Sequence, residues 1–283
     1  MVGAAISSIL AVAIFALMNA GMILSAKNLS LNLTSNSMRT ALDRVEQVVQ
    51  QGDQGDSGNS PIPKLIDTTG ASVTAGAAAG IKFDRFLGAP YVVTLTSGSI
   101  PAASTSLTLT RSTHAVASPP APQPGDIIRI ATTLSTLRPR IQSVTPGTVN
   151  AQSRQPFTVS LTAALGTTIT PLTASVVSAR LVRNVAFIVM PSNGKNELRY
   201  YHTFDTTTNL NDPAQYSVVT DQIGVGTGDA TPFSIVTVGG ESFVNFALRV
   251  RASNADSGMR GQQRDQFNTY TRTETLIRPK NTQ

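Results

Sequence analysis

The chain contains no cysteine and only two histidines, His114 and His202, among its 283 residues. Without cysteine it has no disulfide, no thiolate ligand for zinc or an iron–sulfur cluster, and no cysteine nucleophile. Two histidines also give little material for a histidine metal site or a proton relay. We therefore expect a protein that is not an enzyme and that carries no cofactor and no metal.

Charged and aromatic residues are scarce as well, at 13% and 5% of the chain. The net charge of +6 comes from 22 Lys and Arg against 16 Asp and Glu, and it is spread thinly, without the basic block that tracks nucleic acid. We expect no nucleic-acid partner. Ser, Thr, Ala, Gly and Val make up much of the rest, a mixture that favours short strands and turns.

The longest uncharged stretch lies at the N-terminus, from Val2 to Leu24. As a helix it would measure about 35 Å at the α-helical rise, which is long enough to cross a bilayer. Its apolar residues fall on every face, so it must be surrounded by lipid or by protein. A cleavable secretory signal is the alternative, but no Lys or Arg precedes the apolar run and residues 24–26 fit a small-x-small cleavage pattern poorly.

Residues 25–51 continue the helical pattern in amphipathic form. One apolar stripe repeats at helical spacing, the other faces are polar or charged, and no Gly or Pro occurs between Gly21 and Gly52. We therefore predict one stem helix over 1–51, with a hydrophobic half at 1–24 and an amphipathic half at 25–51. A polar loop rich in Gly and Asp then marks its end.

This two-part helix resembles the N-terminal stem of the type IV pilin and type II secretion pseudopilin superfamily, whose members are pilin-like subunits of the N-terminal methylation type. The resemblance is carried by residues 2–6 (VGAAI), 13–17 (AIFAL) and 41–47 (ALDRVEQ). It implies that the hydrophobic half anchors the subunit in the inner membrane before assembly and packs in the core of a filament afterwards. Two features of that family's start are absent here: the basic leader ending in Gly, and the Phe-Thr-Leu-x-Glu motif, in place of which position 5 is Ala5.

The expected fold class is accordingly α+β, a long N-terminal helix, hydrophobic and then amphipathic, packed on an antiparallel β-rich globular head domain at 52–283. Alternating apolar and polar residues predict strands in the head. They are expected at 89–96, 106–111, 126–132, 157–161, 179–190, 197–204, 233–238 and 243–252. A hairpin turn is expected within 191–196, and irregular Pro-rich loops at 115–125 and 139–156.

Two sets of residues are expected to carry the function. The filament assembly core should contain Ile6, Ile9, Leu10, Ile14, Phe15, Leu17, Met18 and Met22. The contact between stem and head should contain Leu31, Met38, Leu42, Val45 and Val49.

The resemblance implies a structural subunit of a type IV pilus-like or pseudopilus-like helical filament. Its partners would be copies of itself, the inner membrane before assembly, and a pilus or secretion assembly machinery, and the filament would be extracellular or periplasmic. Two other functions stay open at this point. One is a membrane-anchored or secreted periplasmic β-rich binding protein that does not polymerise, and the other is a phage or virion structural protein.

Two groups of side-chain oxygens could in principle bind Ca²⁺, although neither follows a defined calcium-loop pattern and solvated loops are the favoured interpretation. They are Asp53, Asp56 and Asn59 in one loop, and Asp205, Asn209, Asn211 and Asp212 in another. His202 has no second histidine or activated nucleophile beside it, so we expect it to serve packing or the surface.

Overall fold

The computed structural model describes residues 2–52, 63–95, 98–113, 119–131, 136–170, 177–205, 207–224, 229–238, 241–251 and 270–278. Side chains are described within these ranges except at 2–9, 26–27, 30, 131, 238, 241, 251 and 270–274. Within the described ranges the chain forms one helix and fourteen strands, and the strands are joined in a single sheet.

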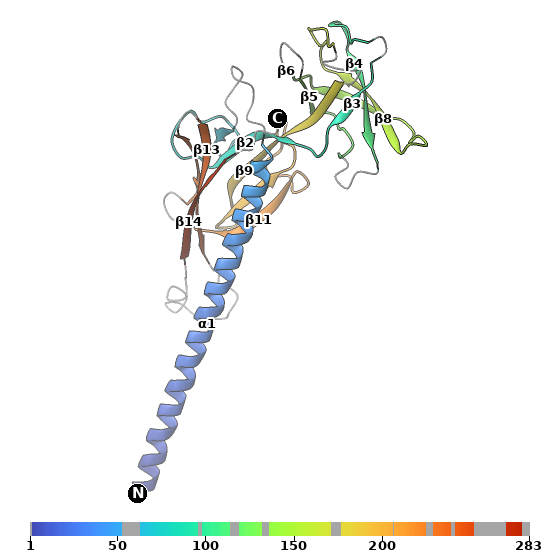
Figure 1. Ribbon diagram of the computed structural model, residues 1–283. Helices are drawn as coiled ribbons and strands as arrows, with labels where there is room; N and C mark the ends of the chain where they lie inside the picture. The colour runs from blue at the N-terminus through green and yellow to red at the C-terminus, as the bar shows by residue number, and fades with distance from the viewer. Residues whose placement is uncertain are drawn as a thin grey trace.

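The helix, α1 (Val2–Gln50), projects from one end of the sheet as a rod (Figure 1). Only its C-terminal part packs on the strands, where Thr34, Met38, Ala41, Val45 and Val48 form a buried stripe. The spacing of four and three residues places these side chains on one face. Gly52 follows two residues after the end of the helix, and a Cβ there would lie 2.8 Å from the Val49 carbonyl oxygen, so glycine lets the chain turn tightly.

The fourteen strands are short apart from two. Their bounds are β1 (Lys64–Ile66), β2 (Gly80–Phe86), β3 (Tyr91–Val93), β4 (Ser106–Ser112), β5 (Ile127–Ala131), β6 (Thr136–Leu137), β7 (Ile141–Pro146), β8 (Arg154–Leu161), β9 (Val177–Ser192), β10 (Lys195–Tyr201), β11 (Tyr216–Ile223), β12 (Phe233–Val238), β13 (Glu241–Arg251) and β14 (Tyr270–Ile277). The longest path through the sheet runs β12-β13-β11-β10-β9-β3-β4-β8-β7, and its pairings are antiparallel.

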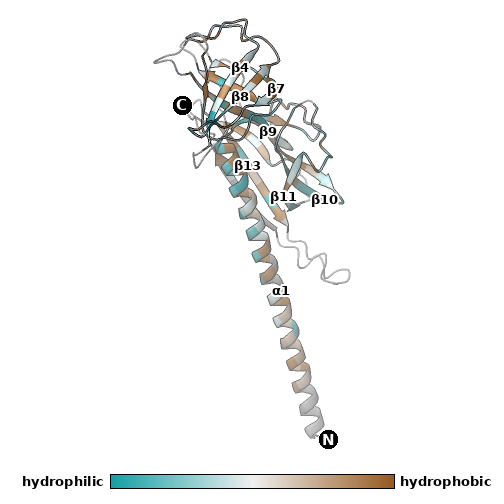
Figure 2. Ribbon diagram, turned by 90° about the vertical axis from the view of Figure 1, so that its right-hand side faces the viewer, coloured by the Kyte–Doolittle hydropathy of each residue, from teal (hydrophilic) through white to brown (hydrophobic). Residues whose placement is uncertain are grey.

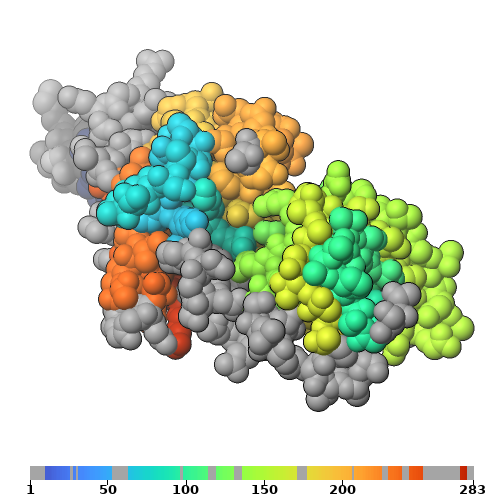
Figure 3. All heavy atoms as spheres, turned by 90° about the horizontal axis from the view of Figure 1, so that it is seen from above, coloured from blue at the N-terminus to red at the C-terminus, as the bar shows by residue number. Residues whose placement is uncertain are grey.

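The 16-residue strand β9 connects two lobes. Its first half pairs with β3 and β5, and its second half pairs with β2 and β10. We call the body around β3, β4, β5, β7 and β8 the distal lobe, and the body around α1, β2 and β10 to β14 the helix-side lobe. The strands of the two lobes lie apart when the molecule is seen from above, with the distal lobe in green and yellow (Figure 3).

Each lobe has its own hydrophobic core. The helix-side core joins the buried stripe of α1 to a set of aromatic rings that includes Phe83, Phe187 and Tyr200. The distal core is built around Tyr91, Phe157 and the aliphatic side chains of β4 and β5. Side chains alternate along β9, so Ala186, Ile188 and Met190 form a third, smaller cluster on the face opposite α1.

The α+β fold class expected from the sequence is wrong. The described chain is mostly antiparallel β-sheet, with 46% of its residues in strand and fourteen strands in one sheet. Helix–sheet packing does not organise this fold, because α1 covers only part of one core while the distal core forms without it. The physical reason is the pairing of distant strands along β9, which a pattern of local periodicity does not show.

The individual strand expectations are also corrected in part. The stretch 139–156, expected to be irregular, contains β7 and the start of β8. Strands β1, β2, β6, β11 and β14 were not expected from the sequence at all. Several of them are short or carry polar side chains on both faces, so their alternation is weak.

The turn between β9 and β10 lies within the stretch expected to form a hairpin. Asn193 and Gly194 have φ angles of 50° and 74°, and Ser192 pairs with Lys195 across the turn. A two-residue loop with positive φ at both positions is the type I′ geometry, which Asn-Gly adopts readily. The local sequence therefore specifies this turn.

Candidate assembly surface

The surface that stands out is the N-terminal half of α1, which has large apolar side chains open to solvent. Between residues 10 and 24 they are Leu10, Val12, Ile14, Phe15, Leu17, Met18, Met22, Ile23 and Leu24, with exposed fractions from 44% to 73%. At about 100° per residue these side chains leave no sector of the helix wider than about 100° without a large apolar group. We call residues 10–24 the apolar half-helix. In Figure 2, where the ribbon is coloured by hydropathy, this part of α1 is mostly pale and brown.

The residues expected in an assembly core fall on this surface where they are described. Leu10, Ile14, Phe15, Leu17, Met18 and Met22 are 50% to 73% exposed. The side chains of Ile6 and Ile9 lie outside the described residues, although both positions are helical. The described members therefore share one helix segment that none of the described strands covers.

The residues expected at the contact between stem and head are divided by the structure. Met38, Val45 and Val49 are buried in the helix-side core, and Leu42 packs at its edge. Leu31, in contrast, is 42% exposed because the sheet does not reach that turn of the helix.

Sequence reasoning missed three further buried positions on α1. Thr34, Ala41 and Val48 are fully buried, with no exposed surface. Thr34 and Ala41 were hidden in the periodicity because their side chains are polar or small, whereas Val48 is apolar and was passed over in favour of its neighbour Val49. The apolar spacing from Met38 to Val45 could have located Ala41, which sits between them on the same face.

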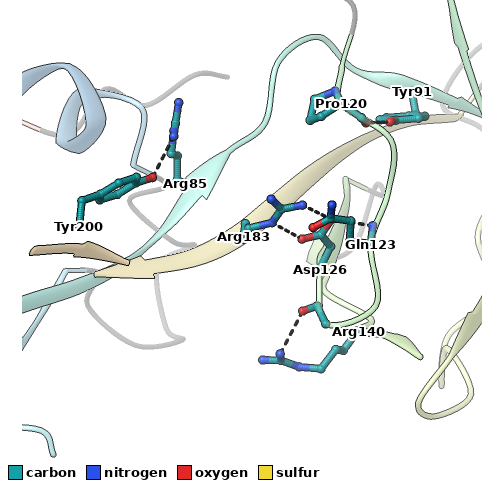
Figure 4. A network of polar contacts seen from close by, with 9 residues as sticks. Arg85, Tyr91, Pro120, Gln123, Asp126, Arg140, Arg183 and Tyr200 are labelled. Atoms are coloured by element: carbon teal, nitrogen blue, oxygen red, sulfur yellow. Dashed lines mark hydrogen bonds and ion pairs between the residues drawn. The ribbon is translucent and has the colours of Figure 1, made fainter. Parts of the chain in front are cut away.

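Polar contacts attach the end of α1 to the sheet. Arg85 donates to Gln51 Oε1 at 2.7 Å and to the Tyr200 hydroxyl at 2.9 Å. On β9, Arg183 lies opposite Arg85 in the strand register and donates twice to the carboxylate of Asp126, at 2.6 Å and 2.9 Å (Figure 4). These contacts lie where the two lobes meet, so they help to orient the distal lobe relative to the helix.

His202 lies close to three arginine side chains. Its ring meets the Tyr200 ring edge-on, with 4.9 Å between centroids. Burial lowers the pKa of His202, and the positive charges of Arg44, Arg85 and Arg183 lower it further. The lowered pKa favours the neutral imidazole, which keeps this edge-on contact with Tyr200 while partly exposed.

The second group of calcium-candidate oxygens forms turns instead of a cation site. Asp205 Oδ1 accepts from the Thr207 amide at 2.8 Å, Asn209 Oδ1 from the Asn211 amide at 3.1 Å, and Asp212 Oδ1 from the Ala214 amide at 3.0 Å. The first group, Asp53, Asp56 and Asn59, lies outside the described residues. Among the residues that the structure describes, no cluster of three or more His, Asp or Glu side chains is placed to hold a metal ion.

Two further findings bear on function. Within the described part of the chain, no helical stretch combines the length and the apolar character that crossing a membrane requires. Comparison of the chain with protein-family models, with curated proteins and with solved structures finds no match.

Proposed function

We propose that the protein is a structural subunit of a helical filament, and that it assembles through the apolar half-helix. The observation that carries this proposal is the exposure of large apolar side chains around the whole circumference of α1 between residues 10 and 24. Contiguous exposed apolar surface of this kind marks a site of interaction with protein or membrane.

The distribution of these side chains favours many partners over one. A single protein partner would cover one face of the helix and leave the others in water. Copies of the same helix packed around one another would cover all faces at once. Burial of each large apolar side chain from water contributes about 1.5–3 kcal/mol, so nine of them supply a strong driving force for assembly.

Small residues on the same segment would let helices approach closely. Ala13, Ala16, Ala20 and Gly21 lie among the large side chains, and the position of a Cβ on Gly21 has open space around it. Close approach of backbones supplies the packing that stabilises helix pairs where the hydrophobic effect alone does not, as in a transfer from lipid to protein.

The position of the lobes is compatible with this assembly. Both lobes lie at the opposite end of α1 from the apolar half-helix (Figure 1). A bundle of apolar half-helices would therefore carry the sheets on its outside. One contact repeated from copy to copy without closing generates an open helix, which is a filament.

The surroundings of the subunit belong to the same proposal. The partners are copies of the chain, the inner membrane before assembly, and a pilus or secretion assembly machinery. The assembled filament would be periplasmic or extracellular. These statements rest on the resemblance of residues 2–6, 13–17 and 41–47 to the pilin and pseudopilin stem.

The test compares two variants of α1, each of which carries one added negative charge at a different position. Ile14→Asp puts a carboxylate into the proposed core, where desolvation costs several kcal/mol per subunit. Asn36→Asp adds the same charge at an exposed polar position of α1 and is the matched control. We expect filaments from the native protein and from Asn36→Asp in negative-stain electron microscopy, and none from Ile14→Asp.

Circular dichroism should show the same β-rich spectrum for both variants, because Ile14 is exposed and lies outside the cores formed by the described strands. Normal filaments from Ile14→Asp would refute assembly through this surface. Absence of filaments from the native protein under any assembly condition would favour a binding protein that does not polymerise.

A further inference from the structure

A cavity of about 730 Å³ lies on the face of the sheet opposite α1, where the two lobes meet. The turn after β1, strands β2 and β9, the loop after β10, and the residue before β7 contribute to its walls. Lys82 and Asn184 lie on this face because their odd-numbered neighbours, such as Phe83 and Val185, point into the core under α1. The volume is in the range of small-molecule binding sites, which occur preferentially between domains.

Two cationic side chains of the cavity lining, Lys82 and Arg140, have hydrogen-bond donors that the described residues leave unused. In the described part of the chain the ammonium group of Lys82 makes no hydrogen bond or ion pair. Burial, together with the charge of Lys64, lowers the pKa of Lys82. A partner carboxylate would instead raise this pKa. Arg140 donates one Nη1 hydrogen bond to the Gly125 carbonyl at 3.0 Å, and its other donors make no contact within the described residues (Figure 4).

Other residues of the same lining carry acceptors. The side-chain oxygen Oδ1 of Asn184 is buried and accepts no hydrogen bond from the described residues. A buried acceptor left without a hydrogen bond is unfavourable, and a donor on a ligand can satisfy it. Asp205 uses Oδ1 for the amide and hydroxyl of Thr207, and Oδ2 accepts no hydrogen bond from the described residues.

The charged side chains of the lining do not pair with each other directly. Arg140 contributes to lowering the pKa of Asp205, after the larger effect of the hydrogen bonds from Thr207, but the two side chains form no ion pair. A ligand that fills the gap must therefore offer acceptors to Lys82 and Arg140 and donors to Asn184 and Asp205. The Asp205 carboxylate would repel a simple polyanion, and the ammonium group of Lys82 would repel a simple cation.

We propose that this cavity binds an acidic saccharide. Its carboxylate pairs with Lys82 and Arg140, and its hydroxyl groups donate to Asn184 and Asp205. Ala71 and Leu210 supply apolar surface for the ring carbons. This binding site goes beyond the proposed role in a filament and does not depend on it.

The test uses isothermal titration calorimetry on the full chain in a polyoxyethylene detergent, which has no sugar headgroup. The probes are digalacturonate, the neutral disaccharide maltose, and succinate, which carries carboxylates without a sugar ring. We expect digalacturonate to bind at least tenfold more tightly than either of the others. Equal binding of succinate would overturn the saccharide assignment, equal binding of maltose would overturn the role of the cations, and no binding of digalacturonate at 10 mM would overturn the site.

Two variants and a control locate the binding. Lys82→Gln removes the unpaired charge and should weaken digalacturonate at least tenfold. Lys195→Gln removes the same charge at an exposed pair with Asp221, 3.8 Å apart, and should change binding less than twofold. Ala71→Trp places a bulky ring at the exposed rim and should also abolish binding, which keeps the site testable if Lys82→Gln fails to fold. Wild-type affinity in a folded Lys82→Gln variant or in Ala71→Trp would overturn the proposal.

Discussion

The ion pair between Asp126 and Arg183 should be one of the most sensitive points of the fold. Asp126 is 1% exposed and the Arg183 side chain is 15% exposed. The carboxylate accepts two hydrogen bonds from Arg183 and one from the Gln123 amide, at 2.9 Å. The bidentate geometry ties the segment before β5 to the middle of β9, where the lobes join.

Arg183→Met removes two of these three hydrogen bonds and leaves the buried carboxylate with the Gln123 amide alone. Breaking a buried pair by removal of one partner typically costs about 3–5 kcal/mol. Domain stabilities are typically about 5–15 kcal/mol, so this loss is a large fraction of the total. The matched control is Lys195→Met, which breaks a pair whose side chains are 49% and 52% exposed and should cost no more than about 1 kcal/mol.

A second variant separates the value of the pair from the cost of the orphaned charge. Asp126→Leu combined with Arg183→Met removes both charges, and apolar replacement of a buried pair is often neutral. We therefore expect the double variant to be more stable than Arg183→Met alone.

Urea unfolding of the full chain in detergent, followed by circular dichroism, gives the free energy of unfolding of the native protein and of the three variants. Hydrogen exchange then shows whether β5 and the distal lobe open first. The reasoning is refuted if Arg183→Met costs no more than Lys195→Met, or if the double variant is no more stable than the single one.

The remaining predictions concern the helix and the distal core. Val45→Ala should lower the free energy of unfolding by about 1–3 kcal/mol, because it leaves a cavity where a fully buried side chain was. Ile14→Ala should leave the free energy of unfolding of the unassembled subunit unchanged, because Ile14 is exposed. Equal effects of the two variants in urea unfolding would contradict the division of α1 into a packed part and an exposed part. Burial raises the pKa of Tyr91 to about 12, and its hydroxyl donates to the Pro120 carbonyl. The folded state therefore holds the phenol proton above pH 10, where the unfolded chain releases it, so stability should fall as pH rises from 10 to 12. Thermal unfolding of Tyr91→Phe should show a smaller decline over the same interval, and an identical decline would exclude Tyr91 as its source.

The helix shows how far local patterns reach. Its end near Gly52 follows from the first glycine after a long run of helix-compatible residues, and its apolar stripe indicates Met38, Val45 and Val49 as positions for contact. The extent of contact does not follow, because Leu31 has the same periodicity but lies beyond the edge of the sheet. Periodicity predicts a face, whereas the sheet decides how much of that face is covered.

The sheet shows the opposite case. Alternation predicted β12 and β13 within a few residues, but not β7, which lies in a Pro-rich stretch, nor β14. The error in fold class has the same origin, since counting expected strands does not reveal that β9 serves two cores. The cavity could not be predicted either, because Lys82, Arg140 and Asn184 are far apart in sequence.

By itself, the sequence determined what depends on neighbours along the chain: the uncharged helix over residues 2–24, the tight Asn193-Gly194 turn, and the lack of cysteine chemistry. These properties follow from side-chain composition, helical periodicity and allowed φ angles, which act within a few residues. Only the tertiary structure decided the pairing of β9 with both lobes, the burial of Asp126 against Arg183, and the position of Lys82 and Asn184 in the lining of one cavity. Each of these depends on contacts between segments that are distant in sequence. Such contacts form only in the folded chain, and burial and strand pairing supply their energy.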